Sequence, residues 1–198
     1  MSVILLVRHA AYDDIGGFLA GRSPGVGLGA TGRAQAARLA ARLRRERLDM
    51  VEASPRERTQ ETARAIADAS GLAEPRTVDA LDEIDFGRWS GQEFARLDAD
   101  PLFRAWNEAR ATARTPAGES MSDVQTRIVR HMEVLTRAPN AACIALVSHA
   151  DVIKAAVCYV LGLPLDAYRL FDVDPASITK VRAGPTGMRL AGLNEVVW

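Results

Sequence analysis

The stretch that decides the fold is Ile4-Leu5-Leu6-Val7-Arg8-His9-Ala10, and a matching stretch near the other end of the chain is Ile144-Ala145-Leu146-Val147-Ser148-His149-Ala150. Each is a short apolar run with β-branched residues, which is typical of a parallel strand buried on both faces of an α/β sheet. Each run stops at a histidine. Because ligands bind beyond the carboxyl ends of strands in open α/β sheets, we expect His9 and His149 to share one site.

Length and composition favour a single globular domain over residues 1–198. The 25 basic and 25 acidic residues are interspersed, which argues against a nucleic-acid or membrane surface. Two cysteines, and an N-terminal apolar run too short for a signal peptide or membrane span, predict a reduced, cytoplasmic protein. A monomer or a homodimer is compatible with the small exposed edge strand that we expect.

Hydrophobic spacing predicts alternating helices and strands. The helices are expected at about 31–47, from about 55, at 122–137 and at 151–161, and the strands at 48–53, 76–78, 143–148, 178–182 and 187–193. Thr31 is the expected N-cap of the first helix, and Ser54-Pro55-Arg56-Glu57 is interpreted as a capping box opening the second. Residues 92–120 are expected to form a small, polar helical cap over the strand ends, and His131 to be structural or exposed.

Residues 27–32, Gly-Leu-Gly-Ala-Thr-Gly, match the dinucleotide-binding fingerprint letter by letter. That fingerprint must follow a strand directly, whereas the nearest predicted strand ends well before it. We therefore assign it no nucleotide-binding role.

Arg58 lies in the first turn of the helix expected after Ser54. A helix N-terminus offers unpaired N–H groups and a positive dipole end to an anion, and an arginine adds a planar fork of donors. The placement favours an anion site, the alternative being an exposed helix arginine.

Residues 81–91 place three carboxylates, Asp82, Glu83 and Asp85, among Leu, Ile, Phe and Trp side chains. Apolar surroundings disfavour the charged form of a carboxyl, so this segment could supply a proton donor near neutral pH. Turn acids above a hydrophobic staple are the alternative.

If these segments meet, the site holds two imidazoles, two guanidinium groups and a carboxyl. No metal set is evident, because Arg8 and Arg58 would repel a cation and no third His or Cys accompanies the pair. A serine triad is disfavoured, since Ser148 adjoins His149 only in sequence and alternate side chains of a strand point apart. Fixed positive charge around a neutral imidazole suits phosphoryl transfer best.

The ordered motifs of the chain resemble those of the histidine phosphatase superfamily, also called phosphoglycerate mutase-like. They are Leu6-Val7-Arg8-His9, Ser54-Pro55-Arg56-Glu57-Arg58-Thr59-Gln60-Glu61-Thr62-Ala63, Leu81-Asp82-Glu83 with Gly87, Trp89 and Gly91, and Val147-Ser148-His149. The segments 117–120 and 177–179 are also similar to family motifs. The resemblance implies a three-layer α/β/α sandwich with a mostly parallel central sheet, and a phosphohistidine mechanism without a metal or other cofactor.

The resemblance also implies the residue roles. His9 would be the nucleophile, Arg8 and Arg58 the phosphate clamp, and His149 a further donor to the phosphoryl oxygens. Glu83 would be the general acid and later the base for water. If Glu83 does not hold the acid role, Asp82 or Asp85 is the next candidate. Arg22 and Ala150 complete the expected substrate contacts.

The chain departs from the family pattern after the nucleophile. Ala10, Ala11, Tyr12 and Ile15 stand where Gly-Glu-Thr or Gly-Glu-Ser and a later Asn are usual, so the polar contacts around the phosphate are expected to differ. We expect a metal-independent phosphomonoester hydrolase acting on a small phosphorylated metabolite. A cofactor-dependent phosphoglycerate mutase-type phosphomutase, which usually has a longer insertion, and a non-catalytic phosphate-binding regulatory module are the alternatives.

Overall fold

A computed structural model describes residues 2–137, 142–184 and 187–197. The described strands form a six-stranded sheet in the order β3-β2-β4-β1-β5-β6. They are β1 (Ser2–Arg8), β2 (Met50–Ala53), β3 (Arg76–Thr77), β4 (Cys143–Ser148), β5 (Ile178–Gly184) and β6 (Gly187–Glu195). β1 to β4 run parallel, whereas β5 and β6 are antiparallel additions at one edge. The prediction of a mostly parallel α/β sheet is confirmed.

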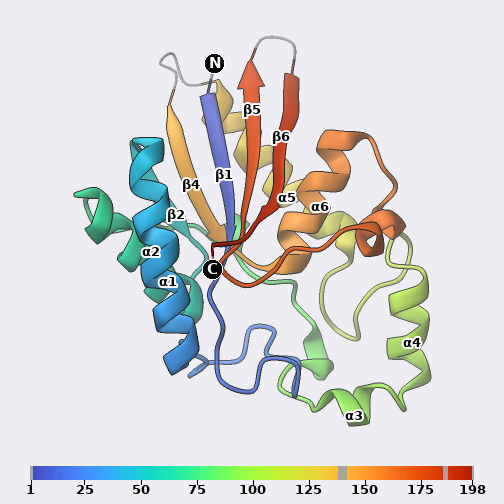
Figure 1. The fold of residues 1–198 in the computed structure, drawn as a ribbon. Coiled ribbons are helices and arrows are strands. Elements are labelled where there is room, and N and C mark those ends of the chain that lie inside the picture. Colours follow the sequence, from blue (N-terminus) through green and yellow to red (C-terminus); the bar gives the residue numbers. More distant parts are fainter. Residues whose placement is uncertain (1, 138–141, 185–186, 198) are drawn as a thin grey trace.

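Helices cover both faces of the sheet (Figure 1). Leu5 and Val7 of β1 belong to a core shared with α1 (Ala30–Leu43) and α2 (Glu57–Ser70), while Ile4 and Leu6 pack into a second core with α5 (Met121–Thr136) and α6 (Ala150–Leu161). Alternate residues of a strand face opposite sides, so a strand that is apolar at every position is buried by helices on both. The predicted three layers follow directly from this alternation.

The predicted N-cap of the first helix is wrong. Gly29, in extended conformation, precedes α1, and Thr31 lies inside the helix. A Cβ atom at position 32 would collide with the carbonyl oxygen of Ala11, so Gly32 allows the loop after β1 to pack against α1. The glycines of residues 27–32 thus serve local packing.

The predicted capping box at Ser54 is also wrong. Arg56 occupies the N-cap position of α2 without a side-chain hydrogen bond, and the buried Ser54 is used elsewhere. Arg58 does lie in the first turn of α2, as predicted. A true capping box occurs at α5, where Ser120 and Asp123 bond to each other's backbone N–H groups.

Residues 92–120 are less helical than predicted. They contain only α3 (Phe94–Leu97) and α4 (Pro101–Glu108), because Asp100 caps a new helix with Pro101 at its start and the chain after Glu108 forms turns. Short 3-10 helices complete the described elements: η1 (Arg44–Glu46), η2 (Asp79–Leu81), η3 (Gly87–Trp89) and η4 (Leu165–Leu170). His131 of α5 is structural, with Nε2 lying 2.6 Å from Oε2 of the buried Glu52.

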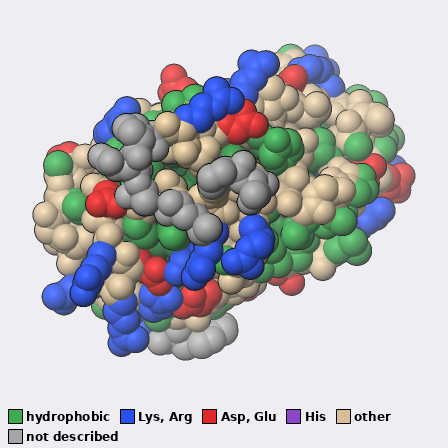
Figure 2. All heavy atoms as spheres, turned by 90° about the horizontal axis from the view of Figure 1, so that it is seen from above, with side chains coloured by type: hydrophobic (Ala, Val, Ile, Leu, Met, Phe, Trp, Pro, Cys, Tyr) green, Lys and Arg blue, Asp and Glu red, His purple; other side chains and the backbone are tan. Residues whose placement is uncertain are grey.

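The loop after β1 and helices α3 and α4 lie beyond the carboxyl ends of β1 and β4, below the sheet in Figure 1. Main-chain hydrogen bonds join this loop to the segment before α3: Leu19 N–H donates to the Gln92 carbonyl, and Phe94 N–H to the Gly17 carbonyl. On the opposite end of the molecule, basic and acidic side chains are mixed (Figure 2). Among the described helices, none is both long and apolar enough to cross a bilayer.

Candidate active site

The sheet register brings the two strand-end histidines together. Arg8 of β1 pairs with Ser148 of β4, so the next residues, His9 and His149, leave the sheet side by side. Their ring centroids lie 5.2 Å apart, and both side chains are buried. The structure thus brings the two histidines together, and their sharing of one functional site stays a prediction.

The hydrogen bonds of His9 define which ring nitrogen carries the lone pair. Nδ1 lies 2.8 Å from the Ala10 carbonyl oxygen, which can only accept, so Nδ1 is protonated and donates. Nε2 in turn accepts from Nε–H of Arg58 at 3.3 Å. Burial, followed by the charges of Arg58 and Arg8, holds the pKa of His9 well below its ordinary value. His9 is therefore neutral at pH 7 and presents a nucleophilic Nε2.

Arg8 and Arg58 carry buried donors that face the same place. Arg8 donates through Nη1 to the Val173 carbonyl (2.7 Å), and Arg58 through Nη2 to the Gly21 carbonyl (2.8 Å). Nε of Arg8 and Nη1 of Arg58 are buried with no hydrogen-bond partner in the described part of the chain. Buried N–H groups of a cation are costly to leave unpaired, which makes this pair a ready anion site.

A cavity of about 380 Å³ opens above these groups. Five of the residues predicted for the site line it, namely Arg8, His9, Arg58, Glu83 and Ala150. Ala150 is the first residue of α6, so the unpaired N–H groups and positive dipole end of that helix face the same cavity. His149 and Arg22 do not line it.

Glu83 follows η2 and reaches the cavity with a side chain that is 13% exposed. Its Oε2 lies 3.5 Å from Nδ1 of His149, and its Oε1 accepts from the backbone N–H of Ile84 at 2.9 Å. Burial, with a further contribution from the charge of Asp151, raises the pKa of Glu83 to about 7. A carboxyl with this pKa is half protonated at neutral pH, as a general acid that later becomes a base requires.

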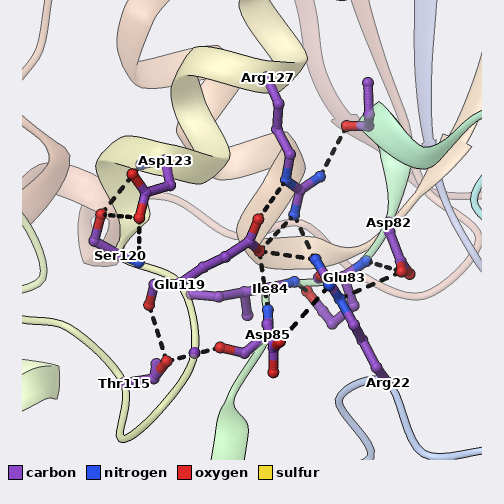
Figure 3. A network of polar contacts seen from close by, with 12 residues as sticks. Arg22, Asp82, Glu83, Ile84, Asp85, Thr115, Glu119, Ser120, Asp123 and Arg127 are labelled. Atoms are coloured by element: carbon purple, nitrogen blue, oxygen red, sulfur yellow. Dashed lines mark hydrogen bonds and ion pairs between the residues drawn. The ribbon is translucent and has the colours of Figure 1, made fainter.

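The residue predicted as a further substrate contact, Arg22, lies in a network behind Glu83 (Figure 3). Arg22 donates to the Glu83 carbonyl (2.8 Å) and to Glu119 (2.9 Å), and Arg127 also donates to both. Glu119 accepts from Asp85 N–H as well. The guanidinium of Arg22 is thus occupied by protein groups, and it fixes the backbone that carries Glu83.

The other two carboxylates of residues 81–91 also lie outside the cavity lining. Asp82 is buried and accepts from the Glu83 N–H (2.8 Å), while Asp85 lies 3.8 Å from Arg22 and accepts from Gly87 N–H. Among the three acids, the geometry favours Glu83 as proton donor.

His149 is held by a chain of polar contacts that the sequence did not predict. Arg58 Nη2 lies 3.1 Å from its Nδ1, and Ser54 Oγ lies 2.8 Å from its Nε2 and 3.2 Å from Asp82. Because a guanidinium only donates, Nδ1 accepts and Nε2–H donates to Ser54 in this arrangement. Burial, followed by the charge of Arg58, holds the pKa of His149 well below its ordinary value, so the ring is neutral.

Sequence reasoning missed three residues of the site. Ser54 was assigned to a helix cap, Asp151 was given no role, and Tyr12 was noted only as a departure from the family pattern. Asp151 and Tyr12 line the cavity, and the Tyr12 ring lies 6.0 Å from that of His9 and 5.7 Å from the Arg58 guanidinium. Only their position within a few residues of a strand end could have signalled them. The described residues include no group of three or more His, Cys, Asp or Glu side chains placed to hold a metal ion.

Comparisons with known proteins agree with this geometry. The family model described as histidine phosphatase superfamily (branch 1) matches residues 4–196. The chain is 33% identical to phosphoserine phosphatase 1 of Hydrogenobacter thermophilus over 91% of this chain and 86% of that protein. It is 31% identical to a probable phosphoglycerate mutase of Enterobacter sp. (strain 638), over 78% of this chain and 72% of that one.

Among solved structures, a mycobacterial glucosyl-3-phosphoglycerate phosphatase in complex with VO3 superposes with a TM-score of 0.87. The two chains are 28% identical, and the match covers 98% of this chain and all of the other. The motifs, the fold and the family model therefore lead to one conclusion: this chain belongs to the histidine phosphatase superfamily.

Proposed function

We propose that the protein is a metal-independent phosphomonoester hydrolase that acts on a small phosphorylated metabolite through a phosphohistidine intermediate. The observation that carries this proposal is the pair of buried, unpartnered N–H groups on Arg8 and Arg58 beside the lone pair of His9 Nε2. They provide an oxyanion site and a nucleophile within one cavity. The phosphatases named among the relatives support the same reaction class.

In the first half-reaction, Nε2 of His9 gives up its hydrogen bond from Arg58 Nε–H and attacks phosphorus while the bond from phosphorus to the ester oxygen breaks. Arg8 and Arg58 neutralise the equatorial oxygens, and Glu83 donates its proton to the departing oxygen. The Nδ1–H bond from His9 to the Ala10 carbonyl keeps the ring oriented and stabilises the positive charge that phosphorylation places on it. The products of this step are the free alcohol and phosphohistidine.

In the second half-reaction, the Glu83 carboxylate accepts a proton from water as the water oxygen attacks phosphorus. The bond from phosphorus to Nε2 breaks, and inorganic phosphate leaves with His9 restored. A pKa of about 7 suits Glu83 to both roles, because neither protonation state is rare near neutral pH.

We assign His149 and Ala150 supporting roles in the same steps. The backbone N–H groups at the start of α6 add donors for the phosphoryl oxygens. His149 becomes a donor through Nδ1 if Arg58 Nη2 gives up its bond to Nδ1 and the Ser54 hydroxyl reverses its bond and donates to Nε2, which a hydroxyl is able to do. Arg22, with Glu119, acts as a positioning residue for the Glu83 backbone.

Two features of the sequence-based expectation stay predictions. One is a single domain over residues 1–198 in which residues 92–120 act as a cap. The other is a reduced, cytoplasmic setting, which depends on the two free cysteines, Cys143 and the buried Cys158.

The test is phosphate labelling of the protein, with the acid and alkali stability of the label measured, combined with turnover of 4-nitrophenyl phosphate. We expect alkali-stable, acid-labile label on the wild-type protein, and neither label nor turnover with His9→Ala. His131→Gln, which changes a histidine outside the cavity, is the matched control and should retain both.

Two further assays separate the alternatives. Interconversion of 2- and 3-phosphoglycerate in the presence of bisphosphoglycerate, without phosphate release, would identify a mutase. Phosphate-dependent protection against unfolding with no labelling by any donor would identify a non-catalytic phosphate-binding module.

A further inference from the structure

Apart from the proposed phosphate-binding groups, the cavity is lined largely by apolar side chains. This apolar lining, which we call the leaving-group wall, comprises Tyr12, Ile15, Phe18, Leu19, Phe86, Phe94 and Pro175. Most of it comes from the loop after β1, and the backbone bonds of that loop to residues 92–94 bring Phe94 alongside. Tyr12 and Phe18 contact each other edge to face, with ring centroids 5.7 Å apart. A phosphate ester held by Arg8 and Arg58 must direct its alcohol portion along this wall.

The charged groups of the cavity lining are few. Arg8 and Arg58 are committed to the phosphoryl group and Glu83 to proton transfer, which leaves Asp151 as the remaining charge in the lining that the structure describes. No third cation lines the described part of the cavity that could pair with a second anion on the substrate.

Three other cations, which are not in the cavity lining, are engaged by protein groups. Arg22 is bonded to Glu119, and Lys154 lies over the rings of Tyr168 and Phe171, at 5.7 Å from each centroid. Arg110 is stacked 4.0 Å from the Trp106 ring and 3.9 Å from the Tyr168 ring.

Asp151 itself is fixed in place by Arg110, whose Nη1 donates to Asp151 Oδ1 at 2.5 Å. Its side chain keeps 19% exposure, on the cavity side of α6. A carboxylate on the leaving group would therefore meet an apolar wall and the carboxylate of Asp151, which is already paired with Arg110. It would lose its water and gain no cation in exchange.

We propose that the leaving-group wall selects phosphomonoesters of uncharged, apolar or aromatic alcohols and discriminates against alcohols that carry a second anionic group. This proposal rests on the function proposed above and names the substrate class of that same site. The proposal predicts that phosphoglycerate and phosphoserine, which the names of its relatives would suggest as substrates, are poor substrates of this protein.

The test compares primary alkyl phosphates, so that the intrinsic reactivity of the leaving group changes little. The panel is 2-phenylethyl phosphate, 3-phosphoglycerate, phosphoserine and phosphoethanolamine, each measured as kcat/KM. We expect 2-phenylethyl phosphate to exceed 3-phosphoglycerate and phosphoserine by about tenfold or more. Equal or higher values for either anionic substrate overturn the proposal. A preference for phosphoethanolamine also overturns it, because Asp151 would then act as an ammonium site.

A positive charge placed on the leaving-group wall should weaken the preference for the uncharged alcohol. Ile15 is 37% exposed at the mouth of the cavity, so Ile15→Arg can offer a cation without being buried. We expect the ratio of kcat/KM for 3-phosphoglycerate over 2-phenylethyl phosphate to rise by about tenfold or more. Leu170→Arg, the same kind of change at a residue that is 75% exposed and outside the cavity, is the matched control and should leave the ratio unchanged.

Asp151→Asn is a second variant that keeps the proposal testable if Ile15→Arg does not fold. It should raise the same ratio several-fold, and a change in the pKa of Glu83 cancels because both substrates need the same acid. An unchanged ratio in both variants contradicts the proposal. Failure of all phosphate esters, including 4-nitrophenyl phosphate, with no labelling of His9 would instead reject the proposed function itself.

Discussion

The pKa of Glu83 leads to a specific pH dependence of turnover. With a pKa of about 7, the protonated fraction of Glu83 is about 0.9 at pH 6 and about 0.1 at pH 8, so the acid-dependent rate falls by about tenfold across this range. An exposed glutamate with an ordinary pKa would be only about 3% protonated at pH 6. His9 adds no second transition near pH 6.5, because burial and the two arginines keep its pKa well below that value.

The assay measures kcat/KM between pH 5.5 and 9 for wild type and Glu83→Gln, with 2-phenylethyl phosphate and with 4-nitrophenyl phosphate. The ionisation of the substrate, with a pKa of about 6, is removed by taking the ratio of wild type to variant at each pH. For the poor alkyl leaving group this ratio should reach about 10² to 10³ at pH 6 and fall about tenfold by pH 8. For the activated aryl ester it should stay near unity.

Asp151→Asn tests the cause of the shift. Because the Asp151 charge contributes to the raised pKa of Glu83, its removal should move the decline of the alkyl ester rate to lower pH. Equal losses for both leaving groups in Glu83→Gln, or a ratio that does not vary with pH, would refute the assignment of Glu83 as general acid.

Three further predictions follow from the same contacts. Arg58→Lys removes the planar guanidinium that donates to both His9 and the Gly21 carbonyl, so kcat/KM should fall by about 10²-fold. Arg64→Lys, on the exposed face of α2, is the control and should leave kcat/KM unchanged. The folded-state pKa of Glu83 lies above its unfolded value, so its contribution to stability is present below about pH 4.5 and is lost as pH rises through about 7. Urea unfolding should therefore show Glu83→Gln to be more stable than wild type at pH 9, by up to about 3 kcal/mol, and the difference should shrink towards pH 5. Trp106→Ala should cost about 3–5 kcal/mol in the same assay, because the fully buried indole packs against the rings of Phe86, Trp89 and Phe103.

The elements that sequence reasoning predicted well are those whose signal is local. Apolar runs at β1 and β4 indicated strands buried on both faces, and hydrophobic spacing indicated α5 and α6 to within a residue at each end. His9 and His149 could be paired without coordinates, because parallel strands end at the same edge of a sheet. Helix starts were less predictable: both Thr31 and Ser54 have the right side chain for an N-cap, yet Gly29 and Arg56 occupy those positions.

Ser54 shows why a local rule can fail. Its hydroxyl could bond either to the backbone of α2 or to side chains from elsewhere in the chain. Because β2 pairs with β4, the Ser54 hydroxyl lies within hydrogen-bond distance of His149 and Asp82. A hydrogen bond in a buried site, where water cannot compete, outweighs a cap at the surface. Arg22 follows the same logic, since Glu119 and the Glu83 carbonyl lie close enough to occupy its donors.

The sequence by itself therefore determined the strand pattern, the order of the motifs and the two histidines at the strand ends, because these depend on periodicity and on residue type along one segment. Only the tertiary structure decided the tautomer of His9, the raised pKa of Glu83 and the apolar character of the leaving-group wall. Each of these depends on which distant groups surround a side chain and exclude water from it. Desolvation and charge pairing depend on the groups that surround a side chain in space. The topology of the sheet determines which groups these are.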